Sequence, residues 1–403
     1  MKMLRKRIVA LLAAGAMLTG TLAGCGNSDS GSKAASTSGS SAKTEAQSAS
    51  SESKSSSSSA ASGTSGSEAK GGNDLISDYA SYETVEAADF ISRDSFKLSG
   101  DVSKEYTIAY VAGNMGSAYF YAGPTETQKY IESLGCKCLI SDADADLATQ
   151  VNQIENFITQ GVDAIIINVV DPPSGVSEAL QKAADAGIPV AAVDSMLDEN
   201  FENYLAFIGS DNYALGFSCG VAAANHLVEL YGEVKGTCGV FDGVEGNAVA
   251  QLIYDGFWDG VASIQEDHKL EEVSHLYGGA WTEEAGLQMA EDMLVANEHI
   301  DIMFAISDPF LMGALTACER AGRSEMFMCG RDGDKAALKA VKDGTAVKFI
   351  AGQDPVGMGI IATDLVLSYL ENGTLPEARI LRLAPIEAGV DNIDEVYDPD
   401  AAF

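Results

Sequence analysis

The chain has 403 residues, and its 59 acidic residues against 25 basic residues correspond to a formal net charge of −34 at neutral pH. Nucleic acids and anionic membrane surfaces bind basic proteins, so this charge argues against both as partners of the folded body. Hydrophobic residues make up 46% of the chain, and the length is sufficient for two domains with additional tails.

The first 24 residues have the pattern of an export signal. A basic start is followed by the apolar run Ile8–Leu18, which is too short for an ordinary membrane-spanning helix. The run leads to Leu22-Ala23-Gly24-Cys25, which resembles the bacterial lipoprotein signal. The resemblance implies that residues 1–24 are removed, and that Cys25 is diacylated, becomes the mature N-terminus and anchors an extracytoplasmic protein stably to the cell membrane. The alternative is a plain secretory signal with a chance cysteine.

Residues 26–70 are rich in Ser, Ala and Gly and contain almost no large apolar side chain. Such a segment cannot bury enough surface to offset the entropy lost on ordering, so we expect residues 25–71 to form a lipidated cysteine and a disordered tether. A flexible linker of about 45 residues has an average reach of roughly 35–40 Å. Residues 72–104 contain apolar residues without a clear period, and we expect a partly ordered lead-in to the folded body.

Residues 105–210 alternate between short apolar runs and stretches with helical periodicity. Ala164–Val170 is nearly all apolar and rich in β-branched residues, which is typical of a strand buried on both faces of a parallel sheet. Ser174 is positioned to cap the helix that follows, and Asp146 to cap the helix before it. The predicted strands are Glu105–Ala112, Cys136–Ile140, Ala164–Val170, Ile188–Val193 and Tyr204–Ile208. The first two predicted helices are Tyr119–Leu134 and Leu147–Gln160.

Two of these strands and the helix between them form a βαβ unit of about 30 residues, in which the strands must be parallel. In open α/β sheets, ligands bind beyond the carboxyl ends of the strands. Asp171 and Asp194 follow the two strands of this unit directly. We therefore expect a binding site at this edge of the sheet.

The same alternation restarts after a long predicted helix, Asn212–Tyr231. The predicted strands of this second part are Thr237–Phe241, Glu272–Leu276, Ile302–Ala305, Met326–Cys329 and Val347–Ala351. The predicted helices are Val249–Ile264, Thr282–Asn297, Pro309–Ala321 and Lys335–Lys342. We predict an α/β protein with two lobes, each built on a doubly wound parallel sheet. Periodicity does not assign helix Val356–Leu370 or the segment Arg379–Ala384 to either lobe.

Several local patterns together resemble the type I periplasmic binding proteins, specifically their ribose- and galactose-type sugar-binding branch. The patterns are Tyr119-Phe120 before a helix ending in Leu134-Gly135, GVDAIIINVVD and AGIPVAAVDS within residues 161–195, IGSDN at 208–212, FAISDPFLMGAL at 304–315, CGRDG at 329–333 and IAGQDP at 350–355. No single pattern is decisive, but their order and spacing are specific. The resemblance covers about residues 106–386.

The resemblance implies that three chain crossings join the lobes, near Ser210, near Gln353 and near Arg379–Leu383. The ligand is implied to bind in the cleft between the lobes, which closes by hinge motion. The implied segments are residues 105–210 and 354–382 for the N-terminal lobe and residues 211–353 and 383–396 for the C-terminal lobe.

Sugar sites combine aromatic rings, which stack on the C–H faces of a sugar, with planar polar groups that hydrogen-bond to its hydroxyls. The resemblance implies that Tyr119 and Phe120 are the aromatic residues of the first lobe and Trp281 that of the second. Ser117 and Ser307 stand where the family often has Asn. The polar residues implied to contact the ligand are Ser117, Asp194, Ser195, Gln251, Ser307, Asp308, Asp332 and Gln353.

Two arginines of the ribose-type members are replaced here, by Ser195 and by Gln251. With Asp194 and Asp332 retained, we expect a more negative cleft that disfavours sugar phosphates and acids. Neutral polyols remain, and amine-bearing ligands become more plausible. Arg331 can replace one cation only if it faces the cleft, but neighbouring residues of a strand point to opposite sides, so we expect it to point away from the Asp332 side.

The resemblance implies a monomeric protein that captures a small polar ligand, in the simplest case a neutral monosaccharide, and delivers it to the permease subunits of an ABC importer. The alternative is a sensor that presents a sugar, nucleoside, amine or autoinducer-like molecule to a membrane receptor or histidine kinase. The export signal and the lack of a basic helix-turn-helix disfavour a transcription repressor of the same fold. We predict no enzyme activity, cofactor or metal, because we find no nucleophile–base pair, zinc-ligand set or phosphate-binding glycine motif.

Two remaining features are expected to be structural. The acidic loop Asp142–Asp146 lacks the glycine and the final glutamate of a calcium-binding loop. Six cysteines follow Cys25 and lie mostly in predicted strands or helices. We expect them to be buried and unpaired, with a disulfide as the alternative in an exported protein.

Overall fold

The computed structural model describes residues 90–93, 95–98 and 100–403. Contacts divide the chain into two units, residues 1–65 and 66–403, and the described residues all belong to the second. The predicted signal, Cys25, the tether and residues 72–89 of the lead-in therefore lie outside the described residues. Within the described part of the chain, no helix combines the length and the apolar character needed to cross a membrane.

The first lobe, here called the N-lobe, is built on a six-stranded sheet with the strand order β11-β5-β4-β3-β1-β2. All its strands are parallel. They are β1 (Thr107–Ala112), β2 (Lys137–Asp142), β3 (Ala164–Ile167), β4 (Val190–Val193), β5 (Ala206–Ser210) and β11 (Ile380–Leu383). Every residue of β3, β4 and β5 is buried, as the apolar runs in the sequence require.

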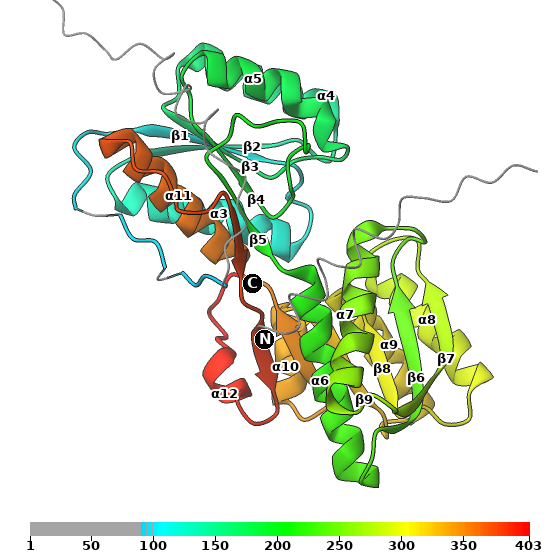
Figure 1. Cartoon of the computed structure of the whole chain (residues 1–403). Helices are drawn as coiled ribbons and strands as arrows, with labels where there is room; N and C mark the ends of the chain where they lie inside the picture. The colour runs from blue at the N-terminus through cyan, green and yellow to red at the C-terminus, as the bar shows by residue number, and fades with distance from the viewer. Residues whose placement is uncertain (1–89, 94, 99) are drawn as a thin grey trace, which may run out of the picture. The chain divides into compact units, whose positions relative to one another are not determined.

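Helices cover both faces of this sheet (Figure 1). One face carries α4 (Leu147–Gln160) and α5 (Ser177–Asp185), and the other carries α3 (Ala118–Ser133) and α11 (Pro355–Asn372). A separate cluster of buried apolar side chains lies under each pair of helices. The parallel sheet is therefore shielded from water on both sides.

The second lobe, the C-lobe, has a six-stranded sheet with the order β12-β10-β9-β8-β6-β7. Its strands are β6 (Lys235–Asp242), β7 (Lys269–Tyr277), β8 (Ile302–Ala305), β9 (Phe327–Asp332), β10 (Val347–Gly352) and β12 (Ile386–Gly389). Its helices are α6 (Asn212–Tyr231), α7 (Ala248–Ile264), α8 (Glu283–Ala296), α9 (Asp308–Ala321), α10 (Lys335–Lys342) and the short α12 (Ile393–Val396). A single large cluster of buried side chains fills this lobe.

The predicted fold class, two doubly wound α/β lobes, is confirmed. The chain passes between the two sheets after β5, after β10 and after β11. Helix α11 packs against α3, β4 and β5, so it belongs to the N-lobe although it follows ten strands of the chain. The segment Arg379–Ala384 forms β11 at the edge of the same sheet.

Strand β12 was not predicted, and it runs antiparallel to β10. The chain leaves β11 at its carboxyl end, Leu383, and begins β12 at Ile386, opposite Gly352, the last residue of β10. It therefore enters the C-lobe sheet at the carboxyl end of β10 and runs back along that strand. An antiparallel edge strand is therefore the consequence of a short third crossing.

Three local predictions have clear outcomes. Asp146 caps α4 as predicted, because its Oδ1 accepts a 2.7 Å hydrogen bond from the backbone N–H of Thr149. The prediction that Ser174 caps a helix is wrong: Ser174 lies inside a 3₁₀ turn, η1 (Pro173–Val176), and α5 starts only after it. The predicted strand Ala164–Val170 ends at Ile167, and the N–H of Val170 donates instead to the side chain of Gln150.

The six cysteines within the described residues are all unpaired and buried, as expected from their places in strands and helices.

Candidate functional site

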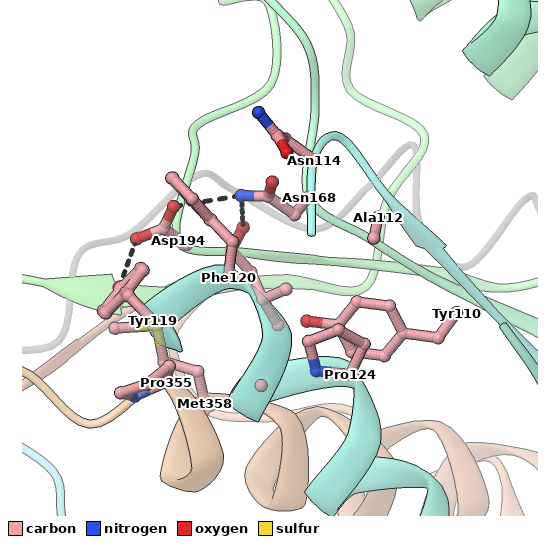
Figure 2. Close-up of a pocket in the computed structure, with 12 residues that line it drawn as sticks. Tyr110, Ala112, Asn114, Tyr119, Phe120, Pro124, Asn168, Asp194, Pro355 and Met358 are labelled. Carbon is pink, nitrogen blue, oxygen red and sulfur yellow. Dashed lines mark hydrogen bonds between the residues drawn. The ribbon is translucent and has the colours of Figure 1, made fainter. Parts of the chain in front are cut away.

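Asp194 follows β4 and lies at the carboxyl end of the N-lobe sheet (Figure 2). Its φ of 63° is in the left-handed region, which Asp adopts more readily than most residues. Its Oδ1 accepts a 2.6 Å hydrogen bond from the hydroxyl of Tyr119, and its Oδ2 accepts a 3.0 Å bond from Nδ2 of Asn168. A carboxylate has about four acceptor positions, so Asp194 is held by the lobe and retains capacity for a ligand hydroxyl.

A pocket opens beside Asp194, between the ends of β1, β3 and β4 and the starts of α3 and α11 (Figure 2). Its lining combines planar polar groups with aromatic rings. The polar groups belong to Asn114, Asn168 and Asp194, and the rings to Tyr110, Tyr119 and Phe120. The cavity has a volume of about 20 Å³, which is room for a water molecule, so these residues form one wall of a candidate site and do not enclose a ligand. Aromatic faces next to carboxylate and amide groups suit contact with a ligand that has C–H surfaces and hydroxyls.

Tyr119 is held in the first turn of α3, and Ser117 is the N-cap of that helix. The Oγ of Ser117 accepts a 3.3 Å hydrogen bond from the N–H of Phe120. The Tyr119 ring has the rings of Phe120 and Phe403 edge-on to it, at centroid distances of 5.1 and 5.2 Å. Burial and the negative charge of Asp194 raise the pKa of Tyr119 well above its ordinary value, so its hydroxyl remains a donor.

The C-lobe contributes Asp332, the last residue of β9, whose φ is 135°. Its Oδ1 accepts a 2.9 Å hydrogen bond from Nε2 of Gln353, at the second crossing. The Oε1 of Gln353 lies 3.4 Å from the Tyr119 hydroxyl. Burial raises the pKa of Asp332 in spite of the opposing charge of Arg331. The single proton of the Tyr119 hydroxyl is donated to Asp194, so the approach of Gln353 Oε1 is a contact and not a second hydrogen bond. Gln353 thus lies between the Tyr119–Asp194 pair of the N-lobe and Asp332 of the C-lobe.

The expectation that Arg331 points away from Asp332 is wrong. One of its guanidinium nitrogens, Nη1, lies 2.8 Å from Oδ1 of Asp332, and Nε donates to the carbonyl of Ile306 at 3.0 Å. The alternation of side chains holds for their Cβ atoms, but the long arginine side chain reaches back around the end of the strand, where Asp332 has left the regular strand conformation. The C-lobe therefore supplies a cation, and a carboxylate already neutralises it.

Asp308 and Ser307 are more buried than the other predicted site residues. Asp308 is fully buried, and its Oδ2 accepts hydrogen bonds of 2.8 Å from the N–H groups of Gly333 and Asp334. Burial and the nearby charge of Asp332 raise the pKa of Asp308 well above its ordinary value. Ser307 is 3% exposed, and its Oγ has no hydrogen-bond partner among the described residues. Asp308 therefore has a structural role, because its bonds to Gly333 and Asp334 hold the loop that follows Asp332.

Trp281 lies at the carboxyl end of the C-lobe sheet. Its ring is 41% exposed and stacks on Phe310 at a centroid distance of 5.4 Å. A Cβ at Gly243, just after β6, would lie 2.4 Å from this ring, so glycine is required for the ring to rest on the backbone. One part of the ring therefore packs on the lobe while another part is open to a ligand.

The two positions that replace the arginines differ in their surroundings. Ser195 belongs to the hydrogen-bonded group around Asp194. Its Oγ lies 3.3 Å from Nδ2 of Asn168, which also donates to Asp194. Gln251 is exposed on α7, and its Nε2 donates to Asp255 of the same helix at 2.8 Å. The described hydrogen bond of the Gln251 side chain is thus to its own helix and not to another predicted site residue.

The sequence analysis missed three residues of this region. Asn168 orients Asp194, Asn114 lines the pocket, and Phe403 lies against Tyr119. Asn168 interrupts the apolar run that was assigned to a strand, and this polar break at a strand end was a usable signal. Asn114 follows the first strand and carries the same signal, whereas nothing local marks Phe403.

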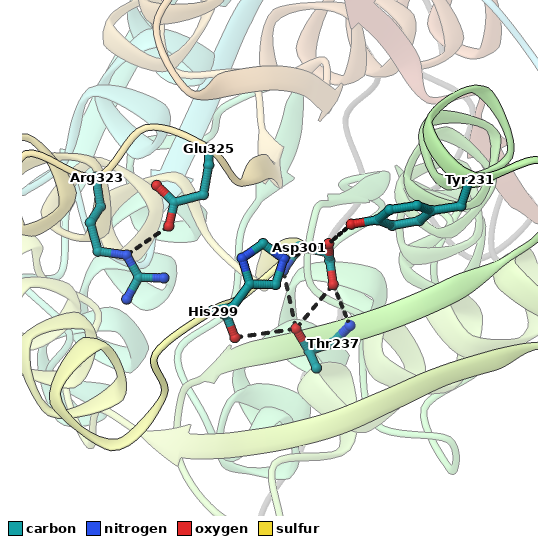
Figure 3. Close-up of polar contacts among 6 residues, drawn as sticks. All are labelled: Tyr231, Thr237, His299, Asp301, Arg323 and Glu325. Carbon is teal, nitrogen blue, oxygen red and sulfur yellow. Dashed lines mark hydrogen bonds and ion pairs between the residues drawn. The ribbon is translucent and has the colours of Figure 1, made fainter.

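A second buried polar cluster lies at the opposite end of the C-lobe sheet, around Asp301 (Figure 3). Its carboxylate accepts hydrogen bonds from the N–H of Thr237 at 2.7 Å and from the hydroxyl of Tyr231 at 2.6 Å. In the N-lobe, Asp163 likewise accepts a 2.8 Å bond from the N–H of Thr107. Each lobe thus uses an aspartate before its third strand to hold the start of its first strand, which identifies the cluster as structural.

The sequence matches the family described as the periplasmic binding protein domain over residues 108–374, and the chain belongs to this family. The resemblance expected from the sequence patterns is therefore confirmed.

Two curated relatives are similar over most of their length. The chain is 30% identical over 262 residues to the ribose import binding protein of Bacillus subtilis (strain 168). The alignment covers 65% of this chain and 80% of that protein. It is 28% identical over 287 residues to the D-xylose-binding periplasmic protein of Escherichia coli (strain K12). This alignment covers 68% of the present chain and 83% of that protein.

A solved structure of a solute binding protein is also similar to this chain in fold and sequence. The crystal structure of an ABC transporter solute binding protein from Agrobacterium vitis with bound D-fucose aligns with a TM-score of 0.58 and 26% identity. The alignment covers 73% of this chain and 98% of that chain.

Proposed function

We propose that this chain is a lipid-anchored, extracytoplasmic binding protein that captures a neutral monosaccharide and delivers it to an ABC importer. The observation that carries the proposal is the series of polar contacts from Asp194 through Tyr119 and Gln353 to Asp332. It links the carboxyl ends of the two parallel sheets, where α/β proteins bind ligands. A ligand bound at both ends would favour one relative position of the lobes, as hinge closure requires.

The charges of the site support a neutral ligand. Asp194 and Asp332 offer acceptors to hydroxyl groups, and the guanidinium of Arg331 is already engaged by Asp332 and a backbone carbonyl. A phosphate or carboxylate on the ligand would meet the like charges of Asp194 and Asp332, and the nearby cation, Arg331, is already paired. The names of the relatives, which refer to ribose, D-xylose and D-fucose, agree with a neutral sugar.

The site acts by binding alone in this proposal, and no covalent step is assigned to any residue. Cys25 would carry the lipid anchor, and residues 26–70 would let a monomeric body move between the membrane surface and the permease subunits. Trp281 and Phe120 would cover the two faces of the bound sugar, because both rings are partly exposed at the carboxyl ends of their sheets.

The test is a thermal-shift and calorimetry series on residues 71–403 with D-ribose, D-xylose, D-allose, D-fucose and D-ribose 5-phosphate. A ligand that binds only the native state raises the melting temperature by mass action. We expect a shift with at least one neutral sugar and none with the phosphate. A shift with an amine or nucleoside in place of every sugar would overturn the proposed ligand class.

Transport is tested separately in cells. Deletion of the gene should abolish uptake of the radiolabelled sugar that binds. Normal uptake together with a lost transcriptional response to that sugar would favour the sensor alternative.

A further inference from the structure

The described residues of the lead-in contact the three chain crossings between the lobes, which are here called the hinge. Ile91 forms a parallel bridge with Leu383, the last residue of β11. Its N–H donates to the carbonyl of Arg382 at 2.9 Å, and its carbonyl accepts from the N–H of Ala384 at 3.4 Å. Ile91 therefore extends the N-lobe sheet by one residue, at the point where the third crossing begins.

Arg93, two residues later, contacts the second crossing. Its Nε donates to Oδ2 of Asp354 at 2.6 Å, and its Nη2 pairs with Oδ1 of the same carboxylate. Asp354 is 7% exposed and also caps α11, because its Oδ1 accepts a 2.7 Å hydrogen bond from the N–H of Gly357. A two-point arginine–carboxylate pair fixes the orientation of both groups.

The first crossing is connected to the same group of residues. Nη1 of Arg382 donates to the carbonyl of Ser210, the last residue of β5, at 3.2 Å. Ile91 holds the backbone of Arg382, so the lead-in and β11 together contact all three crossings on their N-lobe side.

Gln353 immediately precedes Asp354. Its side chain donates to Asp332 and lies within 3.4 Å of the Tyr119 hydroxyl. Any rotation of the backbone at Asp354 moves Gln353 and changes both contacts. The pair between Arg93 and Asp354 is therefore one residue away from the group that connects the lobes.

We propose that residues 91–93 form a hinge brace, in which Arg93 is a positioning residue that sets the orientation of Gln353 through Asp354. The part of this inference that concerns ligand affinity rests on the proposed function. The brace limits the range of lobe positions in the ligand-free protein, and it makes the docking of residues 91–93 and the opening of the cleft mutually dependent.

The same contacts separate this role from helix capping. Asn at position 354 retains a cap for α11, because its side-chain oxygen can still accept from the N–H of Gly357. It loses the charge that pairs with Arg93. Asp354→Asn should therefore behave like Arg93→Ala if the ion pair positions Gln353, and like wild type if Asp354 serves only as a cap.

The experiment measures the distance distribution between the lobes by electron spin resonance, with spin labels on cysteines placed at Glu178 and Val295. Both side chains are highly exposed, at 87% for Glu178 and 90% for Val295, and the six described native cysteines are buried. The background variants are Arg93→Ala, Arg93→Lys, Asp354→Asn and Gln353→Ala. The matched control is Ser92→Ala, which removes a hydroxyl of the same segment whose described hydrogen bond is to Ser95.

We expect Arg93→Ala and Asp354→Asn to broaden the ligand-free distance distribution and Arg93→Lys to restore it in part. Gln353→Ala should broaden it similarly, and adding Arg93→Ala to Gln353→Ala should have no further effect. Affinity for whichever of D-ribose, D-xylose and D-fucose binds the wild type should fall roughly tenfold in Arg93→Ala, which corresponds to about 1.4 kcal/mol.

An unchanged distance distribution in Arg93→Ala would overturn the brace, even if the melting temperature fell, because a lower melting temperature alone indicates a structural role. Additive broadening in the double variant would overturn the action through Gln353. If no sugar binds the wild type, the proposed function fails, whereas the distance measurements still decide the inference.

Discussion

The hydroxyl of Tyr119 donates a 2.6 Å hydrogen bond to Oδ1 of Asp194, although 75 residues separate the two in the sequence. An aromatic ring of α3 and a carboxylate at the end of β4 are thereby fixed relative to one another within a single lobe. A ligand that stacks on this ring meets a carboxylate that is already oriented, which reduces the entropy lost on binding.

Replacing Tyr119 by Phe tests this pair directly. The ring remains, but Oδ1 of Asp194 loses a donor, and Gln353 loses its contact with the N-lobe hydroxyl. We expect sugar affinity to fall about tenfold and the free energy of unfolding to fall by about 1–2 kcal/mol, because a charge-assisted hydrogen bond is lost. Calorimetry and urea denaturation measure the two effects. Tyr121→Phe is the matched control, since Tyr121 is 56% exposed on the same helix turn.

Asp194→Ala and Trp281→Ala are each expected to abolish measurable sugar binding while the protein still folds. Asp194 is the carboxylate of the N-lobe pocket, and Trp281 is the exposed ring of the C-lobe. Calorimetry gives the affinity and circular dichroism the fold. Trp258→Phe, within α7, serves as the tryptophan control. Wild-type affinity in either alanine variant would mean that the site is assigned wrongly.

Phe403→Ala is expected to strengthen sugar binding by a few-fold. The Phe403 ring packs edge-on against Tyr119, a residue that lines the pocket, at a centroid distance of 5.2 Å. We expect a ligand that stacks on the Tyr119 ring to displace it. Loss of one such aromatic contact is worth about 0.5–1.5 kcal/mol. The affinities of Phe403→Ala and of Asp400→Asn, a change in the same tail without a ring, are compared by calorimetry. Weaker binding in Phe403→Ala would instead show that the ring is part of the ligand site.

Asp334→Asn tests the acidic surroundings of Asp332 through pH. Burial, followed by the charge of Asp332, raises the pKa of Asp334 to about 7 in the folded protein, from 3.8. Because the folded pKa is the higher one, the contribution of Asp334 to the stability of the wild type is greatest below the unfolded pKa. It loses stability as the pH rises from about 4 to about 7, with no further loss above.

The asparagine variant lacks this proton uptake, so its stability relative to wild type should increase between pH 4.5 and pH 7.5, by roughly 1–2 kcal/mol. Urea denaturation at the two pH values measures the difference. Asp391→Asn, an exposed position, is the control and should show no such trend. A constant difference between variant and wild type at both pH values would contradict the raised pKa.

The predicted tether and anchor are tested by deletion of residues 26–70 and by Cys25→Ala. We expect the deletion to leave sugar affinity unchanged, because none of the predicted site residues lies within this segment. Cys25→Ala should remove incorporation of radiolabelled palmitate and release the protein from the membrane fraction. Palmitate incorporation that persists in Cys25→Ala would contradict the lipoprotein prediction.

Much of the site could be predicted because it occupies strand ends. Asp194 directly follows the apolar strand β4, and Asp332 is the last residue of the apolar strand β9. Parallel strands bring their carboxyl ends to one edge of each sheet. The surroundings of these residues were less predictable. Asn168 was read as part of a strand, and Arg331 was expected on the wrong side of its strand, because the alternation rule describes Cβ positions and not the reach of a long side chain.

The amino-acid sequence was sufficient to predict the α/β class, the alternation of strands and helices, the cap at Asp146 and the carboxylates at the strand ends. These follow from local periodicity and from turn chemistry. Four features became visible in the folded chain alone: α11 returns to the N-lobe, β12 is antiparallel, Arg93 contacts Asp354, and Phe403 contacts Tyr119. The Arg93–Asp354 contact joins residues 261 positions apart, and it depends on how the whole chain packs rather than on any pattern within one segment.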